Sequence, residues 1–143
     1  MKKIVLCIMT LAMLSCSLED ENTPIENTNS IRFNLNNVAY SLTEFNVQLD
    51  STNSMNRIVE ASFDDNSKAI RFFVLVEETN QIGEFIFINN DVHYSSDVNF
   101  GNRETSITTH TNSKMEGTFN ITTDATFDEP VFTFTNGIIN IEY

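Results

Sequence analysis

The 143-residue chain has no tryptophan, two cysteines, two histidines and only 8 basic residues against 20 acidic ones. The shortage of basic residues gives a net charge of −12, which repels nucleic acid phosphates and anionic lipid headgroups and so argues against a nucleic-acid partner. The lack of tryptophan weakens a carbohydrate-binding interpretation without excluding it. Only Tyr40, Tyr94 and Tyr143 offer an aromatic ring that also carries a polar hydroxyl.

Long apolar runs are also missing. The uncharged run Ile4–Leu14 is too short for a transmembrane helix, which needs about 20 apolar residues. Lys2 and Lys3 precede this run, and the small residues Ser15 and Cys16 follow it. This order is typical of a secretory signal peptide and its cleavage site, so we predict that residues 1–15 are a leader.

Cysteine is scarce enough to limit the covalent chemistry of the mature protein. Cys7 lies inside the leader, which leaves Cys16 as the only mature cysteine and excludes an intramolecular disulfide. The alternative is that both cysteines are buried as small hydrophobic residues. Without disulfides, the domain must depend on its hydrophobic core, and residues 31–143 are enough for one domain but not for two.

The segment Met13-Leu14-Ser15-Cys16 resembles a bacterial lipobox, although Met13 stands where leucine is more common. The resemblance implies that Cys16 carries a thioether-linked diacylglycerol and becomes the first mature residue. Removing Lys2 and Lys3 leaves 6 basic against 20 acidic residues, a net charge of −14. No basic patch would then assist membrane binding, so two or three acyl chains would have to hold the protein.

Residues 16–30 are polar and acidic after the cysteine, and we predict a flexible tether there. Within it, Glu19, Asp20 and Glu21 resemble the acidic export signal of Bacteroidota surface lipoproteins. This resemblance implies the outer membrane, with the domain at the cell surface. The periplasmic face of that membrane is the alternative.

The rest of the chain predicts an all-β domain over residues 31–143. Helix signals are nearly absent, and short runs rich in β-branched and aromatic residues alternate with polar turn clusters at intervals of about 8 to 12 residues. We expect an antiparallel β-sandwich, with a small β-barrel as the alternative. The predicted strands are Ile31–Leu35, Val38–Leu42, Phe45–Asp50, Arg57–Asp64, Ala69–Glu77, Gly83–Asn89, Val92–Tyr94, Ser106–Thr111, Met115–Thr123, Val131–Thr135 and Ile138–Tyr143.

The strongest local pattern is the C-terminal VFTFTNGIINIEY. Asn136 and Gly137 are typical of the two central positions of a type I′ turn, which need positive φ. This turn predicts a hairpin that pairs Thr135 with Ile138. A hairpin also places Phe132, Phe134, Ile139 and Ile141 on one face. We expect Gly137→Val to be costly, since a β-branched residue resists positive φ.

Two further patterns concern the core. Over Met115–Thr123 the inward residues are expected to be Met115, Gly117, Phe119 and Ile121. The run AIRFFVLVEE is apolar on both faces, so this strand is central in its sheet or its second face meets something else. Asp64–Ser67 is expected to form a polar turn before it, and most phenylalanines are expected in the core.

The strand order, the segment MEGTFNIT and the closing FTFTNGIINIEY are together similar to a family of uncharacterised Bacteroidota lipoproteins. Domains of that family end in a G-T-F strand and a T-N-G hairpin. The resemblance implies a β-sandwich. It brings no established activity and no catalytic residues.

The sequence contains no recognised catalytic motif. No G-x-S-x-G elbow and no zinc-ligand spacing occur. Asp91, His93, Ser95 and Ser96 could be drawn as a triad, but successive residues of a strand point in opposite directions. His110 is interpreted as an exposed or loop residue. A glycosidase would need two carboxylates at a fixed separation, which spacing alone cannot show.

Carboxylates near predicted turns raise the question of calcium, which takes oxygen ligands from turns. No D-x-D-x-D-G loop occurs, and solvated acidic turns are the simpler interpretation, so we predict no metal and no cofactor. Asp50-Ser51-Thr52 resembles an O-glycosylation acceptor of Bacteroidota exported proteins, with Ser51 as the modified residue. The carboxylates concerned are Asp64, Asp65, Asp91, Asp97, Asp124, Asp128 and Glu129.

These observations predict a lipid-anchored, non-enzymatic envelope lipoprotein whose β-sandwich binds a ligand or partner, an envelope protein or a glycan, through loops at one end. The alternative is an accessory subunit of an outer-membrane transport or secretion complex, with one apolar sheet face as the contact. A hydrolase is a third, weaker interpretation.

Overall fold

The computed structural model describes residues 29–52, 56–75, 81–96, 102–123 and 130–143. These residues form ten strands and contain no helix. The strands are β1 (Ser30–Leu35), β2 (Val38–Leu42), β3 (Asn46–Leu49), β4 (Asn56–Phe63), β5 (Lys68–Leu75), β6 (Glu84–Asn89), β7 (Val92–Ser96), β8 (Arg103–His110), β9 (Lys114–Thr122) and β10 (Thr133–Glu142).

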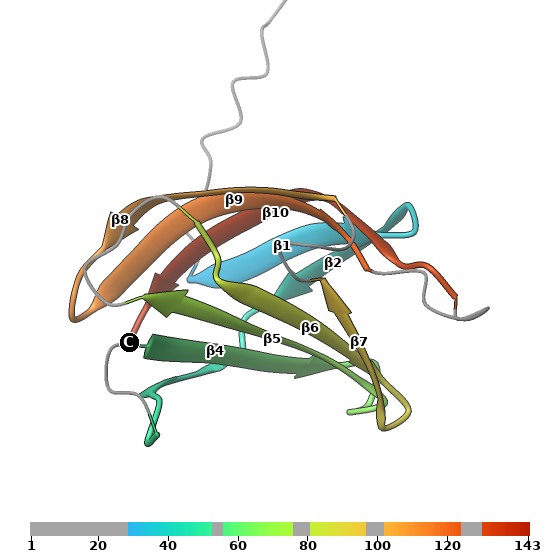
Figure 1. Ribbon diagram of the computed structural model, residues 1–143, viewed down its shortest axis with the longest axis horizontal. Coiled ribbons are helices and arrows are strands. Elements are labelled where there is room, and N and C mark those ends of the chain that lie inside the picture. Colours follow the sequence, from blue (N-terminus) through green and yellow to red (C-terminus); the bar gives the residue numbers. More distant parts are fainter. Residues whose placement is uncertain (1–28, 53–55, 76–80, 97–101, 124–129) are drawn as a thin grey trace, which may run out of the picture.

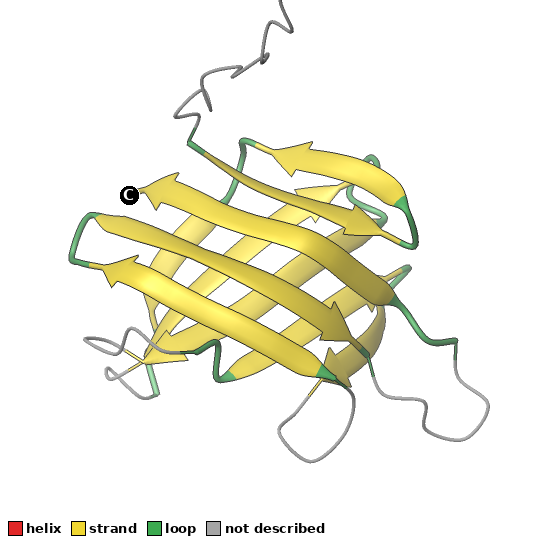
Figure 2. Ribbon diagram, turned by 90° about the horizontal axis from the view of Figure 1, so that it is seen from above, coloured by secondary structure: helices red, strands yellow, loops and turns green. Residues whose placement is uncertain are grey.

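The strands pair antiparallel in two five-stranded sheets, which lie face to face (Figure 1). Sheet A has the order β2-β1-β10-β9-β8, and sheet B has the order β3-β4-β5-β6-β7. Seen from above, the strands of one sheet cross those of the other instead of running alongside them (Figure 2). The predicted antiparallel β-sandwich is therefore confirmed, and the sheets do not close into the alternative barrel.

Alternation along each strand builds the core between the sheets. On β9, Met115, Gly117, Phe119 and Ile121 face inward and are buried, as the sequence pattern predicts. The prediction that AIRFFVLVEE includes a central strand is also confirmed, since β5 lies in the middle of sheet B. Aromatic rings fill much of the space between the sheets. The buried ones are Phe33, Phe63, Phe72, Phe85, Phe87, Tyr94, Phe119 and Phe134.

The predicted C-terminal hairpin is wrong. Val131–Thr135 and Ile138–Tyr143 were expected to pair with each other, but Thr133–Glu142 is one continuous strand, β10. It pairs with β9 on one side and with β1 on the other. Asn136 and Gly137 lie within a β-bulge, where the step from Phe134 to Gly137 opposes the shorter step from Ile121 to Phe119.

The bulge explains why the sequence pattern was misleading. Phe134 and Ile139 both face the core, although their separation of five residues breaks the period of two. Two arrangements can place both side chains on the same face: a two-residue turn between two strands, or one extra residue within a single strand. Asn136 is the extra residue, with a φ of 53°, and its backbone N–H donates to Asn120 Oδ1 at 2.9 Å.

The predicted hairpin implied that Gly137 is needed for a positive φ. In the structure Gly137 is needed instead because a side chain at this position would have no space. A Cβ atom at this position would lie 2.5 Å from Phe119 Cγ and 2.5 Å from the Phe119 carbonyl oxygen. A side chain on Gly137 would therefore collide with a buried ring and with the backbone of β9.

Asparagine-containing turns of the expected type do occur elsewhere. Asn36 and Asn37 join β1 to β2 with φ values of 48° and 69°, and Leu35 pairs directly with Val38. Asn90 and Asp91 join β6 to β7 with φ values of 48° and 65°. Both connections have the positive φ values that a type I′ hairpin needs.

The remaining strand predictions differ from the structure mainly at their ends. β1 begins at Ser30, one residue inside the predicted tether, and Asn29 is already tied to the last strand. Glu142 N donates to Asn29 Oδ1 at 2.8 Å, and Asn29 Nδ2 donates to the Glu142 carbonyl at 3.3 Å. The chain thus enters the domain beside its C-terminal strand.

Candidate functional site

Three turns lie together at one end of the sandwich, on the right of Figure 1. They are Asn36–Asn37, Asp64–Ser67 and Asn90–Asp91, and we call this the asparagine-turn end. Seven residues in these turns have positive φ without being glycine. Asparagine and aspartate tolerate this conformation because their side chains bond locally to the backbone. The predicted polar turn at Asp64–Ser67 is confirmed.

Hydrogen bonds connect the turns to each other and to sheet A. Asn90 N donates to the Ser67 carbonyl at 2.8 Å, which joins the second turn to the third. Asn36 N donates to the Thr133 carbonyl at 2.9 Å, and Thr133 N donates to Asn36 Oδ1 at 2.9 Å. These bonds hold the first turn against β10, so the end is a connected surface and not a set of separate loops.

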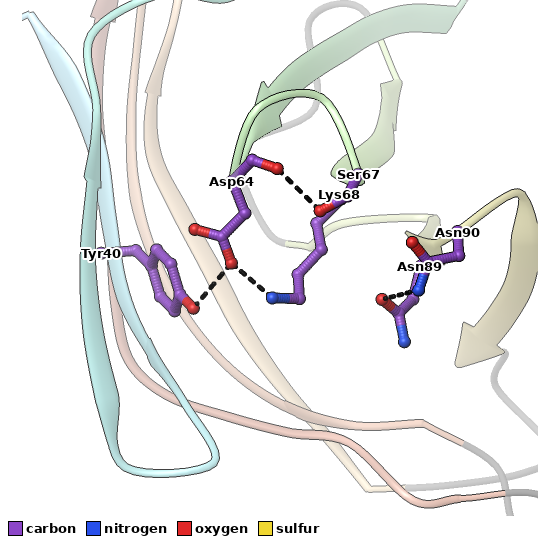
Figure 3. Close-up of polar contacts among 6 residues, drawn as sticks. All are labelled: Tyr40, Asp64, Ser67, Lys68, Asn89 and Asn90. Carbon is purple, nitrogen blue, oxygen red and sulfur yellow. Dashed lines mark hydrogen bonds and ion pairs between the residues drawn. The ribbon is translucent and has the colours of Figure 1, made fainter.

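Asp64 is the centre of the polar contacts at this end (Figure 3). Lys68 Nζ forms an ion pair with Asp64 Oδ2, and the Tyr40 hydroxyl donates to the same oxygen at 3.1 Å. The hydrogen bond from Lys68 lowers the pKa of Asp64, and the bond from Tyr40 adds to this effect. The bond from Tyr40 links β2 of sheet A to the β4–β5 turn of sheet B.

Apolar side chains are exposed around these polar turns. Val38 is 56% exposed, Val92 is 48% exposed and Val131 is 44% exposed. Val38 follows the first turn and Val92 follows the third, while Val131 precedes β10. The asparagine-turn end therefore combines hydrogen-bonded polar turns with scattered exposed apolar side chains.

A second polar cluster lies at the opposite end of sheet A. Arg57 is buried, its Nε donates to His110 Nε2 at 3.2 Å, and its guanidinium carbon lies 4.6 Å from the centre of the Tyr143 ring. The Tyr143 hydroxyl donates to the Thr111 carbonyl at 2.9 Å, and burial raises the pKa of Tyr143. The interpretation of His110 as an exposed or loop residue is wrong, because it lies on β8 and is half-buried against Arg57.

The side chains of His93, Ser95 and Ser96, which the sequence suggested as members of a triad, lie on two different faces of β7. His93 and Ser95 lie exposed on the outer face of β7, whereas Ser96 is fully buried on the inner face. Asp91 lies in the β6–β7 turn. The extended strand keeps these groups pointing in alternating directions, as expected from its period of two.

The other candidate residues fall in several places. Ser51 is exposed beside Asp50, whose Oδ1 accepts a hydrogen bond from Thr52 N at 2.8 Å. Asp64 and Asp65 lie in the β4–β5 turn. Within the described residues, no group of three or more histidine, cysteine, aspartate or glutamate side chains could hold a metal ion. Outside the described residues are Cys16, Glu19, Asp20, Glu21, Asp97, Asp124, Asp128 and Glu129.

None of the three tyrosines forms an exposed platform for a sugar ring. Tyr40 is half-buried and stacks on Phe33 with ring centres 5.6 Å apart. Tyr94 is buried against Phe132, and Tyr143 is half-buried under Arg57. Stacking on these rings is therefore not the basis of a binding site.

The outer faces of the two sheets differ in character. On sheet B, apolar side chains of β4, β5 and β6 surround an ion pair between Arg71 and Glu60, with Nη2 and Oε2 3.0 Å apart. On sheet A the outer face is mostly polar, and it carries Arg32, which no sequence motif had indicated as a site residue. The alternation of Arg32 with buried Ile31 and Phe33 was the signal that placed it outward. The apolar residues on sheet B are Ile58, Phe73, Ile86 and Ile88.

Comparisons of the chain with models of protein families, with curated proteins and with solved structures find no match. The described residues also include no helix that is long and apolar enough to cross a membrane.

Proposed function

We propose that this chain is a lipid-anchored lipoprotein of the outer membrane, displayed at the cell surface, whose β-sandwich binds a partner without catalysing a reaction. Cys16 is the lipidated residue, and Glu19, Asp20 and Glu21 direct export. The acidic segment 16–30 is the tether, and the asparagine-turn end is the binding surface.

The observation that supports this arrangement is the position of the tether relative to the turns. The chain enters the domain beside Glu142, whereas the Asn36–Asn37 turn lies at the other end of β1. A six-residue strand spans about 20 Å. An anchor at Cys16 would therefore leave the asparagine-turn end free to face away from the membrane.

A binding role is also favoured by the hydrogen bonds that two candidate acid–base groups, Asp64 and His110, already make. The Asp64 carboxylate already accepts bonds from Tyr40 and Lys68, and His110 accepts one from Arg57. Both groups therefore already have hydrogen-bond donors in the described structure. The rigid turns and exposed valines remain as the features available to a partner.

Site-specific crosslinking tests the binding surface. Because Cys16 would be lipidated, one introduced cysteine is the only reactive thiol. We would compare Val92→Cys at the asparagine-turn end with Asn112→Cys in the β8–β9 turn at the opposite end. On intact cells, the first variant should give a crosslinked product of defined mass and the second should not. Equal products from both positions, or none from Val92→Cys, would contradict the assignment.

Protease treatment of intact cells tests the surface display. The domain should be digested while the outer membrane is intact. A protein protected until that membrane is broken would place the domain on the periplasmic face instead. A variant with Glu19, Asp20 and Glu21 changed to alanine should become protected if these residues direct export.

The apolar outer face of sheet B favours a second candidate function, an accessory subunit of an outer-membrane complex. Phe73 and Ile58 pair directly across β5 and β4, and both are half-buried on a face with no covering layer among the described residues. Purification after mild crosslinking separates the candidates. A stoichiometric membrane protein lost in a Phe73→Ser variant would support the subunit, and its persistence in that variant would not.

A further inference from the structure

Arg32 occupies an unusual position on the polar outer face of sheet A. It lies on β1, where its neighbours Ile31 and Phe33 point into the core. Across the sheet it pairs with Ile138 on β10 and with Ser41 on β2. Its guanidinium therefore lies on the outer face, away from the edges of the sheet.

Among the described residues, Arg32 is the one basic side chain for which no polar contact within the protein is found. The buried Nε of Arg32 has no hydrogen-bond partner among the described residues, and no ion pair involves the side chain. A buried donor without a partner is costly and calls for a specific explanation. The other five basic residues that follow the leader all make polar contacts, namely Arg57, Lys68, Arg71, Arg103 and Lys114.

A shallow depression of about 300 Å³ adjoins Arg32. Glu116 lines it, but Glu116 Oε1 is paired with Lys114 at 2.7 Å, and its Oε2 accepts a bond from Thr109 at 2.7 Å. The carboxylate of Glu116 is thus already occupied and does not neutralise Arg32. The other lining residues are Thr108, Gly117, Thr118, Ile138, Ile139 and Asn140.

We propose that Arg32 and this depression bind the carboxylate of an acidic sugar, a single uronic acid residue. The planar fork of a guanidinium matches a carboxylate through two parallel hydrogen bonds, and because Nε of Arg32 is buried, its two Nη groups would donate them. Thr118 offers a hydroxyl to the ring, and the Thr108 hydroxyl, which already donates to the Glu116 carbonyl at 3.3 Å, can only accept from it. Ile138, which is 39% exposed, offers an apolar contact to the C–H face of the ring. Recognition by charge does not need the aromatic platform that the chain lacks.

The size and charge of the site limit its ligand. A volume of about 300 Å³ is at the low end for ligand pockets, which leaves room for one ring. A doubly charged phosphate would meet stronger repulsion from Glu116 and from an acidic protein. For a ligand of this size on an open surface we expect a dissociation constant of about 1 mM. The site is separate from the asparagine-turn end and does not depend on binding there.

NMR titration of the full-length mature protein tests the site. The probes are methyl glucuronide, methyl glucoside, acetate and inorganic phosphate, and the reporters are the Nε–H signal of Arg32 and the amides of Thr118 and Ile138. The glucuronide should shift these signals saturably, and the other probes should shift them at least fivefold less at equal concentration. Arg32→Gln should abolish the shifts, while Arg71→Gln on sheet B should leave them unchanged.

Each alternative result would overturn the proposal. If methyl glucoside bound as well as methyl glucuronide, the site would not recognise the carboxylate. If acetate bound as well as methyl glucuronide, the site would not recognise the sugar ring. If phosphate bound more strongly than methyl glucuronide, the ligand would be a phosphate and not a carboxylate of a sugar. No response to any probe in the wild-type protein would overturn the site itself, whether or not the Arg32→Gln variant folds. Loss of turn-end crosslinking would leave this result unaffected, so the two proposals fail separately.

Discussion

At two positions of this domain, the close approach of a neighbouring strand leaves no space for a side chain, so the residue is glycine. Gly137 is a clear case, since a Cβ there would lie 2.5 Å from Phe119 Cγ. Gly117 is similar, because a Cβ would lie 2.5 Å from the Ser106 carbonyl oxygen. The sequence showed glycine at these positions, but the reason became clear only when the neighbouring strands were known.

Gly137→Ala should destabilise the domain by about 1 to 3 kcal/mol, since overpacking a core forces side chains and backbone to move. Gly83→Ala is the matched control, because its Cβ would meet only the Phe73 carbonyl oxygen at 3.5 Å, an ordinary contact. The control should change stability by less than about 0.5 kcal/mol. Urea denaturation measures both values. Equal stability of Gly137→Ala and the wild type would be inconsistent with the packing described.

Asp64 should titrate below the ordinary pKa of an aspartate, because Lys68 donates a hydrogen bond to its carboxylate. The stabilisation from this contact is present above the unfolded-state pKa and is lost as pH falls through the lower folded-state pKa. Carboxyl NMR measures the titration directly. In Lys68→Gln the pKa of Asp64 should rise towards its ordinary value, whereas Lys114→Gln should leave it unchanged. The same Asp64 titration in all three proteins would rule out the contact.

At the scale of elements, hydrophobic alternation predicted most strands because each one buries a single face. Val38–Leu42 has the predicted bounds, and β9 has the predicted inward residues. The pattern failed at β10, where Phe134 and Ile139 fit either a turn or a bulge. Local sequence could not decide between them. The outcome depends on β1, more than 90 residues earlier, which pairs along β10 in place of a hairpin partner.

The bulge at Asn136 gives a test at this scale. Asn136→Val should cost about 1 to 2 kcal/mol, since a β-branched side chain resists the φ of 53°. Asn136→Gly should be nearly neutral, because glycine adopts positive φ freely. Chemical denaturation compares them. Nuclear Overhauser contacts should join Phe134 to Ile121 and Ile139 to Gly117. Contacts that pair Thr135 with Ile138 instead would restore the hairpin.

The polar clusters between elements were beyond prediction from sequence. Arg57 and His110 are 53 residues apart, and only the packing of sheet B on sheet A brings them together. Arg57 also contacts the last residue, Tyr143. No spacing rule relates Arg57 on β4, His110 on β8 and Tyr143, which follows β10. The same holds for Tyr40 and Asp64, whose contact depends on how β2 crosses the β4–β5 turn.

At the scale of the whole molecule, acidity and polarity are arranged around one connected core. Residues 16–143 carry 6 basic and 20 acidic side chains, an excess of negative charge that repels anionic membranes. In the lipoprotein that we propose, the acyl chains on Cys16 supply the membrane attachment. The asparagine-turn end lies across sheet A from Asn29, which is bonded to Glu142 at the other end of β1.

Mass spectrometry of the native protein, extracted from membranes with detergent, examines this attachment directly. We predict an N-terminal peptide that begins at Cys16 and carries a diacylglycerol thioether, together with incorporation of labelled palmitate that is lost in Cys16→Ala. An unmodified peptide that still contains residues 1–15, or equal palmitate labelling of Cys16→Ala, would contradict lipid anchoring and the display of the asparagine-turn end that depends on it.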